Sequence, residues 1–393
     1  MTGKNNKYKV TYGGWYQRTT LHLSEVYNLF AQGYSHLKLS KEELKKLHTG
    51  LDLEHVSRES GNLEFVKAVT SSGIEIRYYE DGLYILEMMT DDIPKTKEFL
   101  EKYFQNKFNP AISYIFSLGA PTPKVLANIK TNHPVVVSVF GEESRNFNPD
   151  KGKFGEVYTK ISSGGMTVYK TPQFIFICGS KASGPSLADL IEMQIFFREF
   201  KDQLEKYLSI HRSVWEEISD IKEAKVIKGK EVEGVRGELD GYQKTISLIS
   251  NRMNQMGSYI GTRSSIAKHL EIEKDLILLF EYKFETLSDT LSYIKEIWKM
   301  TSDYLSSAIQ NLVEIKNQST SNNLKSLQTI TSIGVISGVL GYLSANTLPH
   351  ISKAGAIYFV VLFSLTWLMN YIIVKKYQNK EYSLKFGNRV SNL

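Results

Sequence analysis

Two long runs without a charged residue lie near the C-terminus and constrain the fold more than any other feature. Residues 326–349 contain no Asp, Glu, Lys or Arg, and neither do residues 354–374. At 1.5 Å of rise per residue, a helix over either run is long enough to cross a hydrocarbon layer about 30 Å thick. The alternative is a helical hairpin buried in a large soluble core, but such helices usually keep one polar face. The two runs therefore predict a two-helix transmembrane hairpin.

Basic residues beside the second run predict its orientation. Residues 375–393 carry five Lys or Arg and one acid, whereas the connection between the runs carries only Lys353. Lys and Arg close to membrane segments stay on the cytoplasmic side. The N-terminus has no apolar segment typical of a signal peptide. We therefore expect a multi-pass protein of the cell inner (plasma) membrane, with both termini in the cytoplasm.

The composition argues against several classes of protein. Cys178 is the only cysteine, which excludes a disulfide within the chain and a cysteine-based zinc site. The net charge of +6 is modest and comes partly from the basic tail, so we expect no direct nucleic-acid partner. No nucleophile elbow, metal-binding His pair or phosphate loop has its expected spacing, which argues against an enzyme.

Residues 1–182 predict a cytosolic α+β domain, an α/β sheet with helices. Residues 92–105 predict a helix that Asp92 opens, and the pair Gly164 and Gly165 predicts a hairpin turn. The continuous apolar runs at 134–141 and 174–179 are typical of strands covered on both faces. Short β-rich or apolar runs occur at residues 63–69, 74–79, 83–89, 111–118, 134–141, 167–171 and 174–179.

The middle of the chain is helical. Residues 183–262 predict a long helical hairpin, and residues 263–325 predict a stalk helix that begins after Gly261 and continues into the first uncharged run. A seam with a seven-residue repeat predicts that this stalk packs along its length against partner helices. Its two interleaved sets are Phe284, Leu291, Trp298, Leu305 and Leu312, and Leu287, Ile294, Thr301, Ala308 and Ile315.

The same registers continue into the first uncharged run. Polar side chains at membrane depth usually face a cavity, which predicts that residues 326–349 line a pore. The alternative is that Ser and Thr bond to their own helix or let helices approach closely. One hairpin cannot enclose a pore, so a pore requires a cyclic homo-oligomer. The predicted pore-lining residues are Asn322, Ser326, Thr329, Ile333, Ile336, Leu340 and Leu343, of which Ile333, Ile336 and Leu340 form an apolar gate.

The order of these parts resembles the CorA family of magnesium channels, and the closest match in residues is the stretch 304–346. The resemblance covers the architecture of the whole chain. It implies a funnel-shaped homopentamer whose first membrane helices line the pore and whose second membrane helices lie outside them.

The predicted pore mouth departs from that family. The family's Gly-Met-Asn, usually preceded by Tyr, corresponds here to Tyr342 and then Ser344, Ala345 and Asn346, so only the Asn remains. The connecting loop offers Lys353 and no carboxylate to attract a divalent cation, although Lys353 is also suited to anchoring a helix at lipid headgroups. We expect altered or lost magnesium selectivity.

Two stretches of the first domain are candidates for binding a nucleotide-type ligand. The first suits stacking of an adenine or a cation, or else ordinary core packing. The second is a Gly/Ser-rich strand-to-helix connection, where a helix N-terminus can receive a phosphate or can simply be capped by Ser. The residues are Trp15, Tyr16 and Arg18 in the first stretch, and Lys181, Ser183 and Ser186 in the second.

These features predict a CorA-like ion channel gated through its cytosolic domain. Its expected partners are membrane lipid, further copies of itself and a small nucleotide-type ligand. No cofactor is expected. The candidate ligands are a divalent cation and a nucleotide. Divergent members that look like effectors of type III CRISPR defence, opened by a nucleotide second messenger, are one alternative. A non-conducting, membrane-anchored coiled-coil scaffold is another.

Overall fold

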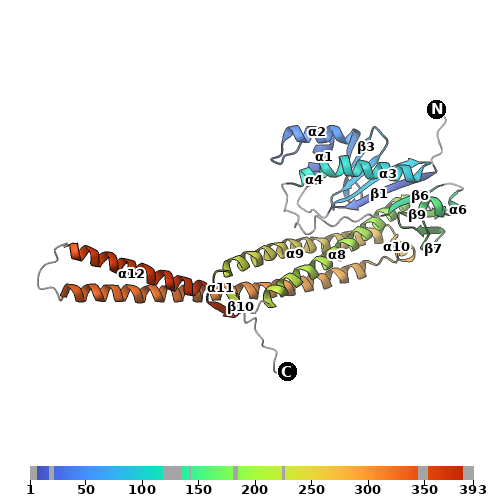
Figure 1. Cartoon of the computed structure of the whole chain (residues 1–393). Helices are drawn as coiled ribbons and strands as arrows, with labels where there is room; N and C mark the ends of the chain where they lie inside the picture. The colour runs from blue at the N-terminus through green and yellow to red at the C-terminus, as the bar shows by residue number, and fades with distance from the viewer. Residues whose placement is uncertain are drawn as a thin grey trace, which may run out of the picture. The chain divides into compact units, whose positions relative to one another are not determined.

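The chain folds into two compact units, described here from a computed structural model (Figure 1). The sheet unit comprises Met1–Ile210 and Leu248–Glu296, and the helical unit comprises His211–Ser247 and Ile297–Leu393. The structure describes residues 7–16, 22–117, 134–140, 143–179, 185–223, 226–343 and 353–383. Three long helices contribute residues to both units: α8 (Pro185–Glu223), α9 (Val232–His269) and α11 (Phe284–Leu343).

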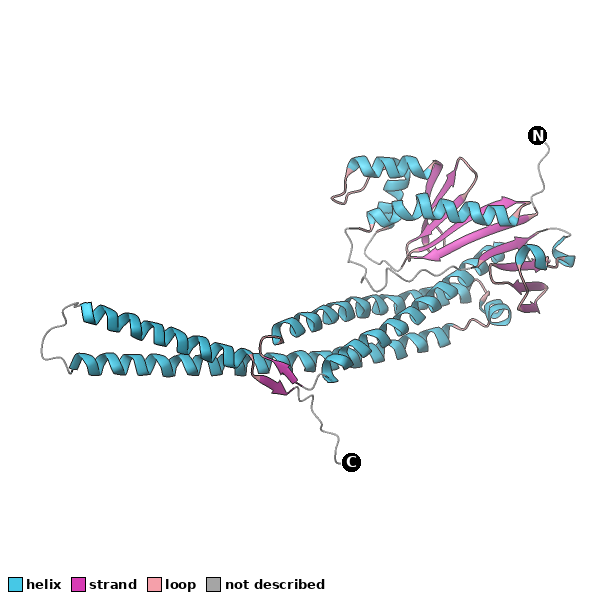
Figure 2. Ribbon diagram, viewed as in Figure 1, coloured by secondary structure: helices cyan, strands magenta, loops and turns pink. Residues whose placement is uncertain are grey.

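The sheet unit is built on one nine-stranded sheet within the described residues (Figure 2). The strand order is β2-β3-β4-β5-β1-β6-β9-β8-β7, and every neighbouring pair is antiparallel except the parallel pair β6 and β9. The strands are β1 (Tyr8–Trp15), β2 (Leu53–Ser60), β3 (Glu64–Thr70), β4 (Glu75–Tyr79), β5 (Leu83–Thr90), β6 (Val135–Val139), β7 (Thr159–Ser163), β8 (Met166–Lys170) and β9 (Phe174–Gly179).

Local sequence explains several of these elements. All five residues of β6 and the first five of β9 are buried, which confirms that these apolar runs form covered strands. Gly164 and Gly165 have φ angles of 59° and 79°, the left-handed values that a two-residue hairpin between β7 and β8 requires. The predicted hairpin is confirmed.

Helices cover both faces of the sheet. Tyr78 belongs to a core shared with α1, α2, α3 and α4, whereas the next residue along β4, Tyr79, bonds to Glu192 of α8, because successive strand side chains point to opposite faces. The Asp92 carboxylate accepts the Lys95 backbone N–H at 3.2 Å and caps α3 as expected. The shorter helices are α1 (Leu23–Gln32), α2 (Lys41–Leu51), α3 (Ile93–Tyr103), the π-helix η1 (Phe104–Phe108), α4 (Asn109–Ile115), α6 (Glu143–Asn146), α7 (Lys151–Phe154) and α10 (Glu273–Phe280).

Two boundaries differ from the sequence prediction. The apolar run at 111–118 is helical over residues 111–115, which belong to α4, a helix with Pro110 in its first turn. The stalk helix does not begin after Gly261. That residue lies inside α9, and the chain then forms α10 before α11 begins at Phe284.

In the helical unit, α8 and α9 of the same chain are the partner helices of the α11 seam. His211 Nε2 lies 2.7 Å from Thr301 Oγ1, and Gln243 Nε2 donates to Ser306 Oγ at 3.3 Å. The predicted packing of the seam against partner helices is confirmed. The seam residues of this unit are at most 9% exposed: Trp298, Thr301, Leu305, Ala308, Leu312 and Ile315.

The transmembrane hairpin predicted at 326–349 and 354–374 is wrong. No helix in the described part of the chain, including α11 and α12 (Lys353–Gln378), is both long and apolar enough to cross a membrane. Hydroxyl and amide side chains interrupt both uncharged runs and make them less apolar. They include Ser326, Gln328, Thr329, Thr331, Ser332, Ser364, Thr366 and Asn370. The predicted multi-pass location in the cell inner membrane is contradicted by the same finding.

We expect His211 to make the helical unit less stable in acid. Burial lowers the pKa of His211 and Arg212 lowers it further, against a hydrogen bond to the Ile297 backbone that raises it. The folded-state pKa therefore lies below the unfolded value of about 6.5. Stability from the neutral imidazole is present above about pH 6.5 and is lost as pH falls through the folded pKa.

We expect the urea midpoint of the helical unit to fall more between pH 7.5 and 5 in wild type than in His211→Gln. Equal losses would show that another group causes the dependence.

Candidate functional site

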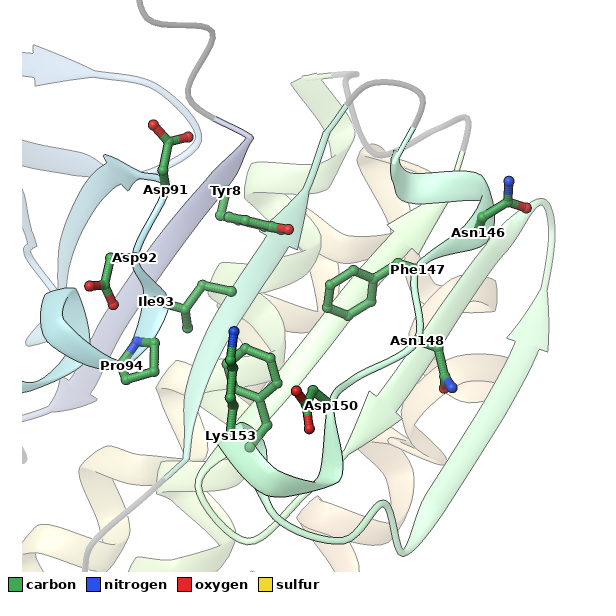
Figure 3. Close-up of a pocket in the computed structure, with 11 residues that line it drawn as sticks. Tyr8, Asp91, Asp92, Ile93, Pro94, Asn146, Phe147, Asn148, Asp150 and Lys153 are labelled. Carbon is green, nitrogen blue, oxygen red and sulfur yellow. The ribbon is translucent and has the colours of Figure 1, made fainter.

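A cleft of the sheet unit lies at the end of the sheet where β1 begins and β5 leads into α3 (Figure 3). Its volume is about 830 Å³. Tyr8, Phe147 and Phe154 supply aromatic walls, and Figure 3 shows Asp150 and Lys153 on one side of the cleft with Asp91 and Asp92 on the other. The remaining lining residues are Ile93, Pro94, Asn146 and Asn148.

The carboxylates of this cleft have local structural roles. The Asp92 side chain caps α3, Asp150 Oδ1 accepts the Gly152 N–H at 2.7 Å, and Asp91 Oδ1 accepts the Lys7 N–H at 3.3 Å. Within the described residues, no group of three or more His, Cys, Asp or Glu side chains could hold a metal ion. Three carboxylates against one lysine favour a small cationic ligand over an anion.

A buried charged network lies on the face of the sheet that α8 and α9 cover. Arg263 of α9 is 2% exposed, and its Nε donates to Asp81 Oδ2 at 2.7 Å. Its Nη1 lies 3.8 Å from Glu192 Oε2. Glu192 Oε1 also accepts Arg77 Nη1 at 2.6 Å and the Tyr79 hydroxyl. The network therefore ties β4 and the turn before β5 to α8 and α9.

Burial and pairing shift the pKa values of this network in opposite directions. Burial by itself lowers the pKa of Arg263, but Asp81 and Glu192 outweigh it and keep the guanidinium charged. Burial raises the pKa of Glu192, and the guanidinium groups of Arg77 and Arg263 oppose that rise. Removing one charged partner would therefore leave a buried charge without compensation.

A second cavity, of about 200 Å³, adjoins this network. Arg77, Tyr79, Asp189, Glu192 and Arg263 line it, together with the β2–β3 turn. Two buried donor atoms, Arg263 Nη2 and Arg77 Nε, have no hydrogen-bond partner within the described part of the chain. Both atoms are themselves fully buried, so they are not exposed to the cavity.

The aromatic candidates Trp15 and Tyr16 lie in the sheet unit and contact protein groups. Trp15 Nε1 donates to the Asp81 carbonyl oxygen at 2.6 Å, and its ring stacks on Phe200 at 5.3 Å between centroids. The Tyr16 hydroxyl donates to Asn109 Oδ1 at 2.7 Å. These contacts are those of core packing, and ligand binding by the two residues stays a prediction. Arg18, Lys181 and Ser183 lie outside the described residues, as does the side chain of Ser186 in the first turn of α8.

The described part of the predicted pore-lining set lies along α11. Ser326 is half-buried, whereas Thr329 and Ile336 are exposed. Thr329 Oγ1 donates to the Lys325 carbonyl of its own helix at 2.8 Å. This bond fits the alternative to pore lining, in which Ser and Thr side chains bond to their own helix. Lys353 is exposed at the start of α12. The side chains of Asn322, Ile333, Leu340, Tyr342 and Leu343, and the whole of Ser344, Ala345 and Asn346, lie outside the described residues.

Sequence reasoning missed the residues of the charged network. Arg263 and Asp81 are 182 positions apart, and no spacing rule connects them. One weak signal was present. Arg263 follows Met256 and Ile260 at helical spacing, and all three are buried in α9. An arginine in an apolar helical stripe needs a buried partner.

No family model, no curated protein and no solved structure matches this chain. The resemblance to the CorA family therefore stays a prediction.

Proposed function

We propose that this chain is a self-assembling helical protein whose copies associate through the exposed apolar side chains of α12 and the end of α11. The observation that supports the proposal is the amount of apolar surface on α12. Eleven large apolar side chains of this helix are 40–66% exposed: Ile357, Val360, Val361, Phe363, Leu365, Trp367, Leu368, Met369, Tyr371, Ile372 and Val374.

The exposed side chains do not form a single face. Trp367, Leu368 and Met369 are consecutive, so they project about 100° apart around the helix. A helix that is apolar on several sides is normally buried, and a large exposed apolar patch marks a contact surface. On α11, Leu324 and Ile336 are likewise exposed, at 55% and 57%. Identical copies would cover these side chains on more than one side, as closed symmetric assemblies do.

The energy of burial is sufficient for association. Burying one Val, Leu, Ile or Phe side chain contributes about 1.5–3 kcal/mol, and association costs about 4–15 kcal/mol. These side chains are 40–66% exposed, so each gains about half of that burial energy, and covering all eleven contributes about 8–16 kcal/mol, which matches the cost. Pentamer number, ion conduction and a defence role stay untested predictions. The proposal does not include them, because they depend on the transmembrane hairpin or on the untested family resemblance.

The proposal predicts the mass of the particle. We expect wild-type protein at 10 μM to elute in light-scattering chromatography at a multiple of 44.8 kDa. The triple variant Val361→Glu, Leu365→Glu and Leu368→Glu should elute as a monomer, because each buried carboxylate lacks a partner. Tyr158→Glu is the control, since Tyr158 is 63% exposed in the sheet unit. It should assemble like wild type.

Two results would contradict self-assembly. One is a monomeric wild-type protein that binds phospholipid vesicles, which would assign the surface to lipid. The other is a triple variant that keeps the wild-type mass. Circular dichroism spectra of the variants would show whether the helices remain folded.

A further inference from the structure

We propose that the cleft of Figure 3 binds a small aromatic ammonium ion, with the ligand's ring against the aromatic walls and its charged group beside the aspartates. The cleft belongs to the sheet unit and α12 to the helical unit, so this site is independent of the apolar surface on α12. The proposal therefore goes beyond self-assembly.

The cleft has the size and the lining of a small-molecule site. Its volume of about 830 Å³ lies within the range of about 300–1,000 Å³ that is typical of such sites. Its wall comes from three parts of the sheet unit, namely the start of β1, the β5–α3 connection with the first turn of α3, and the segment from α6 to α7. Aromatic and apolar side chains with a few polar groups are the usual lining of a ligand pocket, and this wall has both kinds.

The aromatic walls are accessible to a ligand. Tyr8, Phe147 and Phe154 line the cleft, and each is half-buried. The rings of Tyr8 and Phe147 lie 6.2 Å apart between centroids at 62° to each other. Phe147 and Phe154 both pack against the fully buried Phe176, at 5.1 Å and 5.0 Å. The core therefore holds these rings in place, and their outer surfaces can stack on an aromatic ligand or attract a cation.

The carboxylates of the cleft are accessible as well. Asp91, Asp92 and Asp150 are all exposed. The backbone N–H bonds that they accept each use one oxygen, Oδ1. An ionised carboxylate has about four acceptor sites, so each can also accept hydrogen bonds from an ammonium group.

The arrangement of charge favours an organic cation over an anion or a metal ion. Three aspartates and one lysine are present among the described lining residues, so an anion would be repelled. The carboxylates lie on two sides of the cleft in Figure 3, and no three of the described acidic side chains could hold a metal ion together. Lys153 lies on the same side as Asp150, so we place the ammonium group at Asp91 and Asp92.

The test compares four probes of different charge and size with full-length protein at pH 7.5. Phenethylamine, phenethyl alcohol and phenylacetate have nearly the same shape and carry a positive, a zero and a negative charge. Methylamine has the positive charge without the ring. We expect calorimetry to show that phenethylamine binds about tenfold more tightly than phenethyl alcohol, with phenylacetate and methylamine weaker still.

Variants test the charge without removing the local bonds. Asp91→Asn keeps an oxygen that can accept the Lys7 N–H, and it should weaken phenethylamine binding about fivefold, as the loss of one exposed ion pair predicts, with an unchanged thermal midpoint. Lys153→Gln should instead tighten binding, because it removes a like charge from the cleft. Glu54→Gln is the matched control, since Glu54 is exposed on the edge strand β2, and it should bind like wild type.

Hydrogen exchange locates the bound probe independently of any variant. Phenethylamine should protect amides of residues 91–93 and 147–154. The proposal is overturned if phenethylamine binds no more tightly than phenethyl alcohol or methylamine, if Asp91→Asn and Glu54→Gln weaken binding equally, or if the protected amides lie outside the cleft.

Discussion

We expect Arg263→Met to lower the free energy of unfolding of the sheet unit by about 3–5 kcal/mol. Arg263 is 2% exposed and bonds to Asp81 at 2.7 Å, with Glu192 at 3.8 Å. Methionine keeps part of the side-chain volume but leaves both carboxylates without this partner. Glu192 retains Arg77, so Asp81 becomes the main uncompensated group. Urea unfolding, with hydrogen exchange to assign the change to the sheet unit, measures the loss.

Two further variants separate charge burial from general damage. Arg58→Met removes an arginine whose side chain is 45% exposed and paired with Glu64, and we expect a loss of at most about 1 kcal/mol. Adding Asp81→Asn to Arg263→Met should recover part of the stability, because the unpaired carboxylate is gone. If Arg58→Met costs as much as Arg263→Met, burial of the ion pair is not what makes Arg263 important.

Much of the secondary structure follows from short-range patterns. Asp92 caps α3, and the glycine pair at 164–165 turns β7 into β8, because each depends only on neighbouring residues. The repeat from Trp298 to Ile315 predicted a buried stripe, since a helix with this period presents those residues on one side. The repeat does not predict which helices pack against this stripe. They are helices α8 and α9 of the same chain.

The charged network and its cavity were beyond sequence reasoning. Asp81, Glu192 and Arg263 come from a turn and two separate helices, and only the folded sheet unit brings them together. The prediction of a membrane hairpin went wrong for a different reason. It rested on two runs without charged residues, which hydroxyl and amide side chains such as Thr329 and Asn370 interrupt.

The second large effect is expected at Trp298, the largest fully buried side chain of the helical unit. Trp298→Ala should lower the free energy of unfolding of that unit by about 3–5 kcal/mol, through lost burial and the cavity left behind. The indole packs edge-on against His211 at 5.3 Å, and its Nε1 has no hydrogen-bond partner among the described residues. Trp298→Phe therefore removes no such bond and should lower the free energy of unfolding less than Trp298→Ala does.

Met300→Ala is the control, because Met300 is 66% exposed on the same helix and its loss of stability should stay within about 0.5 kcal/mol. If Trp298→Ala and Met300→Ala have equal effects on hydrogen exchange in α11, the seam at Trp298 does not hold the unit together.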